Sequence, residues 1–283
     1  MLIDTDTKYF STLSEPASKV GSFLYKQLFR AYGENAVFLP ISCPDATAAF
    51  SSCRALGFSG LTASMPHKGR ALELVDHVDS KARAIGAVNT IVFRGGLSTG
   101  YNTDWFGAVA ALQDVTPLRD KRVLLLGAGG AARAIAHGIL GEGARLTILN
   151  RTPARLGWLT DQAEVQQGML SELDKAIDDC EIVINATSVG FLGGNANPEF
   201  ARVRFRPAHV LLDAVFDPVE TDLMKAARRA GAIAIPGAAM LVHQGRMQCQ
   251  LWFGRKLDDW APVQAALSDF LIAQAARTGQ AAA

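Results

Sequence analysis

The chain has few cysteines and histidines, no excess charge of one sign and no long hydrophobic run. Its four cysteines and five histidines are scattered, without a Cys-x-x-Cys pair or a metal-ligand spacing. This pattern argues against a disulfide scaffold and against a zinc site, and it favours free thiols in a reducing compartment. We therefore expect no metal in the functional site.

Charge and hydropathy exclude further classes of partner. The 28 lysine and arginine residues balance 27 aspartate and glutamate residues, so no electrostatic footprint indicates nucleic acid or an anionic membrane surface. No apolar run approaches ~18 residues, the length that a membrane span requires. The first ten residues lack the basic start and apolar run of a signal peptide. We expect a cytoplasmic protein with no nucleic-acid or membrane partner.

The length and the pattern of apolar runs predict the fold class. Dividing 283 residues by a typical domain size of about 150 predicts two domains. Short apolar runs alternate with helical patterns, which is typical of an α/β fold with largely parallel sheets. We expect one α/β domain over 1–105, with helices of 240–283 packing back on it. A second, doubly wound α/β domain is expected over 106–239.

The individual elements are predicted from these runs and from the glycine and proline residues that end them. The predicted strands cover 8–13, 36–41, 60–65, 88–93, 97–102, 122–126, 145–149, 181–185, 210–215 and 232–235. The predicted helices cover 19–31, 44–56, 240–253 and 262–277, and others begin near Thr103, after Gly130, near Pro153, at Ser171 and near Asp222.

A glycine-rich turn indicates a dinucleotide site. The predicted strand 122–126 runs into a GxGxxA motif and then into a helix, the context that the dinucleotide fingerprint requires. Gly127 permits the tight turn, Gly129 lets the backbone approach a pyrophosphate, and Ala132 allows close packing of helix on strand. A glycine-rich turn that binds nothing is the alternative, and the correct flanking elements make it the weaker interpretation.

The end of the next strand indicates which dinucleotide binds. About 20 residues on, where an NAD site carries an acid for the ribose hydroxyl, this chain has Asn150, Arg151, Thr152 and Arg155. Guanidinium groups hold a 2′-phosphate that a carboxylate would repel. Two solvated surface arginines are the alternative, but their position favours NADP.

A separate segment, Ser64 to Lys68, carries the candidate for proton transfer. Pro66 suits the first position of a helix, which places Lys68 in the first turn. The helix dipole disfavours a cation there, so Lys68 is suited to act as a general base. Asp104 follows a strand and begins a helix. The alternatives are a solvated lysine and a helix-capping acid, because 36 residues separate the two and spacing alone does not bring them together.

The chain resembles the shikimate dehydrogenase family over nearly its whole length. The matching segments are 64–68, 86–90, 102–104, 127–133, 150–152, 185–188 and 237–244. The resemblance implies reversible reduction of 3-dehydroshikimate to shikimate with NADPH, a step of aromatic amino acid biosynthesis. It further implies a substrate-binding first domain, an NADP-binding Rossmann-type second domain, and a monomer or a homodimer.

The resemblance also implies roles for individual residues, with Lys68 and Asp104 as the catalytic pair, Lys68 as the base. The implied substrate contacts are Ser18, Ser22, Thr62, Ser64, Asn89, Phe216 and Gln244. The implied cofactor contacts are Gly127, Ala128, Gly129, Gly130, Ala131, Asn150, Arg151, Thr152, Arg155, Asn185, Ala186, Thr187, Ser188, Val215 and Gly237. Without the resemblance, Asn89 and Gln244 are equally well read as ordinary polar residues at the ends of elements.

The departures from the family pattern lie on the substrate side. Val20 stands where the family has a second serine for the substrate carboxylate, Thr62 where it has an asparagine, and Phe216 where it often has a tyrosine. The resemblance therefore implies a divergent member with weak activity on shikimate. A quinate or aminoshikimate dehydrogenase stays an alternative. A non-catalytic NADP-binding sensor is a third hypothesis, against which the retained Lys68 and Asp104 argue.

Overall fold

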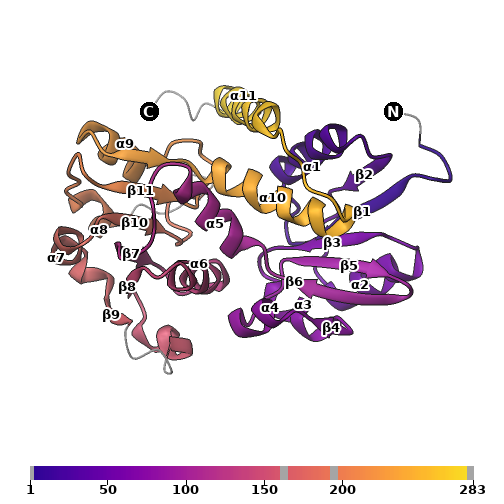
Figure 1. The fold of residues 1–283 in the computed structure, drawn as a ribbon, viewed down its shortest axis with the longest axis horizontal. Coiled ribbons are helices and arrows are strands. Elements are labelled where there is room, and N and C mark those ends of the chain that lie inside the picture. The colour runs from indigo at the N-terminus through magenta and orange to yellow at the C-terminus, as the bar shows by residue number, and fades with distance from the viewer. Residues whose placement is uncertain (1–2, 160–164, 192–196, 279–283) are drawn as a thin grey trace. The chain divides into compact units, whose positions relative to one another are not determined.

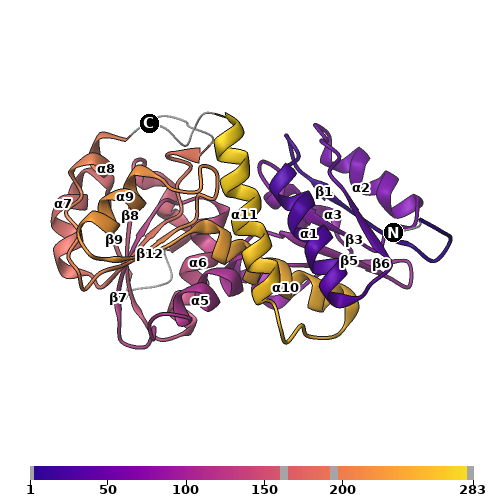
Figure 2. The same ribbon diagram turned by 90° about the horizontal axis from the view of Figure 1, so that it is seen from above.

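The computed structural model describes residues 3–159, 165–191 and 197–278, which form two α/β units (Figure 1 and Figure 2). One unit comprises Met1–Asp104 and Gln244–Leu267, and the other comprises Trp105–His243 and Ser268–Ala283. Each unit contains one six-stranded sheet within the described residues. The predicted α/β fold class with two units is confirmed.

The sheet of the first unit is mixed, with the order β2-β1-β3-β5-β6-β4. Its strands are β1 (Lys8–Leu13), β2 (Ala36–Leu39), β3 (Gly60–Ala63), β4 (His77–Val78), β5 (Thr90–Arg94) and β6 (Leu97–Tyr101). The strand β1 pairs in parallel with β2 and β3, whereas β5 runs antiparallel to both β3 and β6. The antiparallel pair is the predicted hairpin, and it brings the ends of β3 and β6 close to one another.

Helices cover both faces of this sheet (Figure 1). They are α1 (Lys19–Tyr32), α2 (Ala46–Ala55), α3 (Lys68–Leu74) and α4 (Ser80–Ile85). On one face Phe10 of β1 packs against Phe29 of α1, with ring centroids 5.0 Å apart. On the other face Leu13 and Leu61 join Phe50 of α2 in a second core. Alternate residues of a strand point to opposite faces, which is why β1 contributes to both cores.

The sheet of the second unit is all-parallel, with the order β12-β11-β10-β7-β8-β9. Its strands are β7 (Arg122–Leu126), β8 (Arg145–Asn150), β9 (Gln166–Met169), β10 (Ile182–Asn185), β11 (Val210–Asp213) and β12 (Ile233–Ile235). This is the strand order of a Rossmann-type dinucleotide fold, whose switch point lies between β7 and β10. Ligands of such sheets bind outside the carboxyl ends of the strands at that point.

Helices again cover both faces of the sheet (Figure 2). They are α5 (Asp104–Gln113), α6 (Gly130–Gly141), α7 (Leu173–Ala176), α8 (Pro198–Arg202) and α9 (Asp222–Arg229). Val123 and Leu125 of β7 share a core with residues of α5 and α6, whereas Leu124 and Leu126 share one with residues of α7, α8 and α9. The unbroken apolar run of β7 is therefore explained by burial on both faces.

Two helices follow the second sheet, α10 (Gly237–Phe253) and α11 (Ala261–Thr278). Residues 237–243 of α10 group with the second unit, and residues 244–253 group with the first. Within the first unit, the Trp252 indole N–H donates to the carbonyl of Ile91 at 3.0 Å. The part of α11 from Ser268 onward groups with the second unit, where Gln274 donates to the Asp217 carboxylate at 2.9 Å. The last part of the expected 240–283 segment, 279–283, lies outside the described residues.

Some local predictions are wrong. Pro66 does not begin a helix: it lies in a turn, and α3 begins at Lys68. The segment at Pro153 forms a 3-10 helix, Pro153–Leu159, and not an α-helix. The helix expected at Ser171 begins one residue earlier as a 3-10 turn, Leu170–Glu172, and continues as α7. The Met169 N–H donates to the Glu172 carboxylate at 2.6 Å. The polar strand β9 has no apolar signal, and its backbone pairing with β8 alone defines it.

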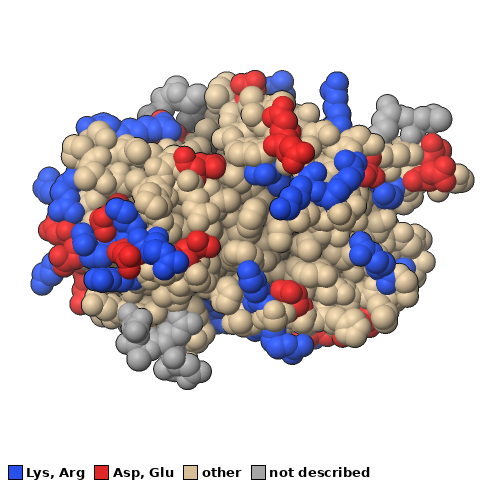
Figure 3. Space-filling view, viewed as in Figure 1, with Lys and Arg blue, Asp and Glu red and all other residues tan. Residues whose placement is uncertain are grey.

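The surface carries charges of both signs. On the face drawn in Figure 3, acidic and basic side chains are interspersed rather than separated into patches of one sign. This matches the near-equal numbers of basic and acidic residues in the chain. Within the described part of the chain, no helix combines the length and the apolar character that crossing a membrane demands.

Candidate active site

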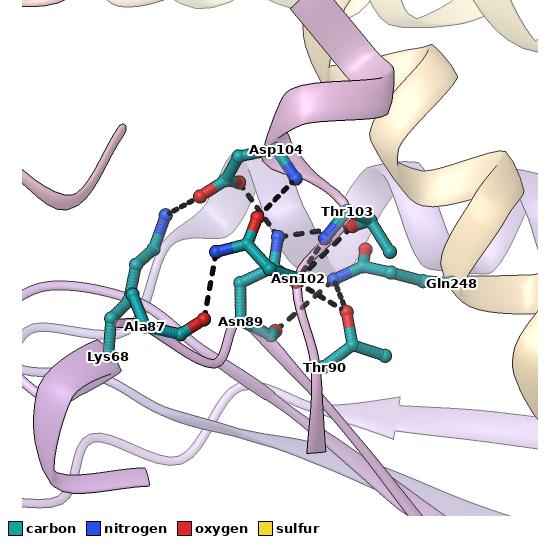
Figure 4. A network of polar contacts seen from close by, with 8 residues as sticks. All are labelled: Lys68, Ala87, Asn89, Thr90, Asn102, Thr103, Asp104 and Gln248. Carbon is teal, nitrogen blue, oxygen red and sulfur yellow. Dashed lines mark hydrogen bonds and ion pairs between the residues drawn. The ribbon is translucent and has the colours of Figure 1, made fainter. Parts of the chain in front are cut away.

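The two candidate proton-transfer residues meet in the first unit. Lys68 is the first residue of α3 and Asp104 is the first residue of α5. The Lys68 Nζ lies 2.6 Å from Asp104 Oδ2 (Figure 4). The Asp104 side chain is 2% exposed, whereas the Lys68 side chain is 20% exposed. The pair thus has a buried carboxylate and an amine that reaches solvent, an arrangement able to exchange a proton with a small molecule.

Asn89 fixes the second oxygen of the Asp104 carboxylate. Its amide N–H group donates to Asp104 Oδ1 at 2.7 Å and to the Thr103 hydroxyl at 3.1 Å. Its amide oxygen accepts from the Thr103 backbone N–H at 2.8 Å and from the Thr90 hydroxyl at 2.7 Å. A backbone N–H only donates, so the amide oxygen must face Thr103 and the amide nitrogen must face Asp104.

The loop from β6 to α5 is locked by Asn102. Its side-chain oxygen accepts from the Asp104 backbone N–H at 3.0 Å, and its side-chain nitrogen donates to the carbonyl of Ala87 at 3.0 Å. This is the local side-chain-to-backbone bonding that asparagine supplies at the start of a helix. The loop therefore places Asp104 at a fixed point relative to the segment that carries Asn89.

Of the other residues expected at the substrate, Phe216 lies in the second unit and the rest lie in the first. Ser18 and Ser22 are at the start of α1, Thr62 is in β3 and Ser64 directly follows β3. Ser18 caps α1, and its hydroxyl accepts from the Val20 backbone N–H at 3.2 Å. Ser18 and Ser64 are exposed, Ser22 is half-buried and Thr62 is 8% exposed. Val20 is 3% exposed, so its side chain belongs to the core.

Two residues of the Asp104 environment, Gln248 and Tyr25, escaped the sequence reasoning. Thr90 and Thr103 lie in the matching segments 86–90 and 102–104, but no role was assigned to them. The Gln248 side chain donates to the Thr90 hydroxyl at 2.9 Å, and its oxygen accepts from the Tyr25 hydroxyl. Gln248 lies one helical turn after Gln244, the half-buried residue that was expected to contact substrate. The i, i+4 spacing on one helix face was the available signal.

The second unit carries the glycine-rich loop at its switch point. Gly127 follows β7 with φ +115°, and a Cβ built on it would lie 2.9 Å from the carbonyl oxygen of Ala186, after β10. Only glycine fits both the conformation and this close approach. The Ala186 N–H donates to the Leu126 carbonyl at 2.9 Å, so the loops after β7 and β10 lie side by side.

The start of α6 suits a phosphate. Gly129 is its N-cap residue and makes no side-chain capping bond, so the first N–H groups of the helix have no side-chain acceptor. A Cβ built on Gly129 would meet no heavy atom within 4 Å, which leaves open space beside the backbone. Ala128 is buried, while Gly130 and Ala131 are half-buried. These groups fit an anion at a helix N-terminus.

The end of β8 carries cations and no carboxylate. Asn150 closes the turn by donating to the Thr152 carbonyl at 2.8 Å. Thr152, Arg151 and Arg155 are exposed, so both guanidinium groups are accessible to a ligand phosphate. The residues present fit the 2′-phosphate of NADP.

A buried cluster holds the loop after β10. Asp213, at the end of β11, is 0% exposed and accepts from Asn185 at 2.9 Å, from the Thr221 hydroxyl at 2.6 Å and from the Val215 N–H at 3.1 Å. The Asn185 oxygen accepts from the Thr187 N–H at 3.1 Å and from its hydroxyl at 2.7 Å. Burial raises the pKa of the Asp213 carboxyl above its ordinary value, while these hydrogen bonds oppose the shift.

The remaining expected cofactor residues surround this cluster. Ser188 is exposed, whereas Val215 is 3% exposed. Gly237 begins α10, and a Cβ on it would lie 2.5 Å from the carbonyl oxygen of Val215, so the helix starts against that loop. Phe216 packs edge-on against Phe191, with ring centroids 5.4 Å apart.

Metal chemistry has no ligand set in the part of the chain that the structure describes. Within residues 3–159, 165–191 and 197–278, no group of three or more His, Cys, Asp or Glu side chains is placed to hold a metal ion. His67, beside Lys68, packs at the corner between β3 and α3, and its Nε2 lies 2.8 Å from the Cys43 carbonyl oxygen.

A Rossmann-type unit with this loop, and a lysine–carboxylate pair in the other unit, define the class of nicotinamide-dependent oxidoreductases. Two family models match the chain: the shikimate dehydrogenase substrate binding domain over residues 13–91, and shikimate / quinate 5-dehydrogenase over residues 110–191. A shikimate dehydrogenase (NADP(+)) from Syntrophobacter fumaroxidans is 36% identical over 268 residues, which cover 94% of each chain.

Solved structures agree with these matches. A shikimate dehydrogenase in complex with NADP+ superposes with a TM-score of 0.87 at 29% identity, covering 95% of this chain and 98% of that one. The enzyme from Thermus thermophilus, in complex with NADP(H) and shikimate, gives a TM-score of 0.83 at 27% identity, covering 93% and 99%. The chain belongs to the shikimate dehydrogenase family, and the resemblance inferred from its motifs is confirmed.

Proposed function

We propose that this chain is an NADP-dependent oxidoreductase that interconverts shikimate and 3-dehydroshikimate, or a close cyclic hydroxy acid and its ketone. The observation that carries the proposal is the Lys68–Asp104 pair, with a buried carboxylate and a lysine open to solvent. A protein that only binds a dinucleotide has no need of such a pair. The names of the relatives support the substrate class and the cofactor.

The chemistry divides into a proton and a hydride. In the oxidation direction, the substrate hydroxyl gives its proton to the neutral Lys68 amine while hydride leaves the same carbon. NADP, when bound, supplies the hydride acceptor at its nicotinamide ring. Asp104 holds the Lys68 Nζ at 2.6 Å and stabilises the ammonium that forms. In the reduction direction Lys68 returns the proton to the carbonyl oxygen.

The residues of the second unit would hold the cofactor. The loop of Gly127 to Ala131 would take the pyrophosphate at the start of α6, and Arg151 and Arg155 would take the 2′-phosphate. Asn150, Thr152 and the loop of Asn185 to Ser188, with Val215 and Gly237, complete the proposed contacts. For Asn185 we propose an indirect role, because its side chain is 1% exposed and bonded to Asp213 and Thr187.

The residues of the first unit would recognise the substrate. The exposed hydroxyls of Ser18 and Ser64, with Ser22, are the proposed donors to the carboxylate, and Gln244 is the proposed donor to a ring hydroxyl. Thr62 of the first unit and Phe216 of the second unit are further proposed neighbours of the substrate. The Asn89 side chain is fully buried, so we propose that it acts on the substrate through Asp104.

The setting of the enzyme follows from the same proposal. We propose a cytoplasmic monomer or homodimer of aromatic amino acid biosynthesis. All four cysteines are buried free thiols, which suits a reducing compartment.

The test is absorbance of reduced nicotinamide with shikimate and quinate, each tried with NADP+ and NAD+. We expect reduction of NADP+ by a substrate of this class and weaker use of NAD+. The buried Val20 and the Phe216–Phe191 contact leave fewer hydroxyl donors, so we expect poor activity on shikimate and a related compound as the best substrate. Binding of NADP+ without reduction by any cyclic hydroxy acid would overturn the proposal and favour the sensor.

A further inference from the structure

A series of buried hydrogen bonds begins at the Tyr25 hydroxyl and ends at the Asp104 carboxylate. The Tyr25 hydroxyl donates to Gln248 Oε1, the Gln248 amide donates to the Thr90 hydroxyl at 2.9 Å, and Thr90 donates to Asn89 Oδ1 at 2.7 Å. Asn89 then donates to Asp104 Oδ1 at 2.7 Å. Figure 4 shows these hydrogen bonds from Gln248 to Asp104, together with Lys68.

The direction of every bond in this chain is determined. Gln248 Nε2 also lies 3.3 Å from the Asn89 carbonyl oxygen, which only accepts, so the amide nitrogen must face it and the amide oxygen must face Tyr25. The amide nitrogen only donates, so the Thr90 hydroxyl must give its own hydrogen to Asn89. Successive bonds that point the same way polarise and strengthen one another.

Because these side chains are buried, water does not compete for their hydrogen bonds. Asn89, Thr90 and Gln248 are each 0% exposed, and Tyr25 is 5% exposed. Burial raises the pKa of Tyr25 well above its ordinary value, so the hydroxyl stays a donor at any working pH. The Tyr25 ring is itself held by stacking on Phe38, with centroids 4.3 Å apart.

We propose that Gln248 and Tyr25 are positioning residues for the Lys68–Asp104 pair. They fix Thr90, Thr90 fixes the Asn89 amide, and the amide holds the Asp104 carboxylate at the angle that receives Lys68. The helix α10 thus acts on the chemistry through its buried Gln248. The expected fall in kcat rests on the proposed function. The expected loosening of the Asp104 carboxylate rests on the described geometry alone.

Three variants interrupt the chain while keeping the size of the side chain close to the original. For Gln248→Met we expect kcat to fall about tenfold, and for Tyr25→Phe about threefold, the range of one or two ordinary hydrogen bonds. The KM for substrate and the Kd for NADP+ should stay within about twofold, because both side chains are buried. The double variant should lose no more than Gln248→Met alone, since both act through one path.

Matched controls separate positioning from general packing. Gln250→Met makes the same change two residues further along α10, at a half-buried side chain, and should leave kcat unchanged. Thr90→Val should lower kcat as Gln248→Met does, whereas Thr90→Ser keeps the hydroxyl and should retain most of the activity. If Gln248→Met fails to fold, Tyr25→Phe and the Thr90 pair still test the chain of bonds.

A measurement that does not depend on turnover tests whether these residues position Lys68. An amine-directed reagent, followed by peptide mass spectrometry, gives the labelling rate of Lys68 relative to exposed Lys26 on α1. We expect Lys68 to react severalfold faster in Gln248→Met and Thr90→Val, because the loosened carboxylate holds it less firmly. Unchanged kcat and unchanged labelling in folded variants would overturn the proposal. Wild-type protein without any turnover would overturn the proposed function instead, and the labelling rates would still decide this inference.

Discussion

The two units each bury one carboxylate against an asparagine amide, and they use it differently. Asp104 is 1% exposed and bonded to Asn89 at 2.7 Å, and Asp213 is 0% exposed and bonded to Asn185 at 2.9 Å. Only Asp104 has a cation, Lys68 at 2.6 Å. Asp213 has neutral donors alone, and burial raises its pKa. A buried carboxylate with neutral donors alone has a structural role. A neighbouring lysine with access to solvent makes proton transfer possible.

The proposed function assigns separate tasks to the two carboxylates. In the first unit, the bonded side chains converge on the group for which we propose proton exchange with substrate. In the second unit, Asp213 ties the start of α9, through Thr221, to the loop of Asn185 and Thr187. Changes around Asp104 should therefore alter turnover, and changes around Asp213 should alter cofactor binding and stability.

The largest effect on kcat is expected when Asp104 loses its lysine and so resembles Asp213. Lys68→Ala leaves Asp104 with its asparagine and without a cation. General acid–base groups contribute about 10²–10⁴-fold, so kcat should fall at least about a hundredfold while the Kd for NADP+ is unchanged. Steady-state kinetics and cofactor titration measure both quantities, with Lys26→Ala on exposed α1 as the control. Wild-type turnover in Lys68→Ala would remove this lysine from the mechanism.

A second effect concerns two proposed substrate contacts, Val20 in the first unit and Phe216 in the second. Loss of two hydroxyl donors at about 1–2 kcal/mol each predicts a kcat/KM for shikimate about ten- to thousandfold below that of a full set. The variant Val20→Ser with Phe216→Tyr should raise that kcat/KM. Because Val20 is 3% exposed, the serine should also lower the Tm, which calorimetry measures alongside the kinetics.

Two results would contradict this interpretation of the substrate side. Wild-type kcat/KM for shikimate within the ordinary range of ~10⁴–10⁸ M⁻¹s⁻¹ would show that Ser22 or another donor compensates. No gain from the double variant in folded protein would show that the pocket is rebuilt around another substrate.

A third effect should appear in the second unit alone. Replacing Arg151 and Arg155 by glutamine removes charge-assisted bonds worth about 1.5–3 kcal/mol each, so NADP+ should bind at least about tenfold more weakly and NAD+ almost unchanged. Isothermal titration with each cofactor measures the ratio. Arg145→Gln, at the other end of β8, is the control. Equal weakening of both cofactors would mean that the two arginines only support the loop.

The contrast between the units also explains what was predictable from sequence. The GxGxxA loop and the arginines after β8 form a contiguous local pattern, so the Rossmann-type unit and NADP followed from spacing. The pairing of Lys68 with Asp104 did not, because it depends on β3 pairing with β5 and β5 with β6. Gln248 and Tyr25 are 223 residues apart, and each is individually an ordinary helix residue. Tertiary packing alone makes them partners.

The smallest expected effect is on stability: the contributions of Asp213 and Asp76 to folding should depend on pH with opposite signs. Burial raises the pKa of Asp213, so its contribution to folding is present below about pH 4 and is lost as the pH rises through the folded-state pKa. Asp76 behaves oppositely: hydrogen bonds from Ser98 lower its pKa to about 2, so its contribution is present above pH 3.8 and lost as the pH falls through about 2.

Two asparagine variants should therefore move in opposite directions. Asp213→Asn should gain Tm relative to wild type between pH 4 and pH 7. Asp76→Asn should lose Tm at neutral pH and converge on wild type near pH 2. Thermal melts across this range measure both, and parallel curves for Asp213→Asn and wild type would show that Asp213 is compensated by its three donors and costs the fold nothing.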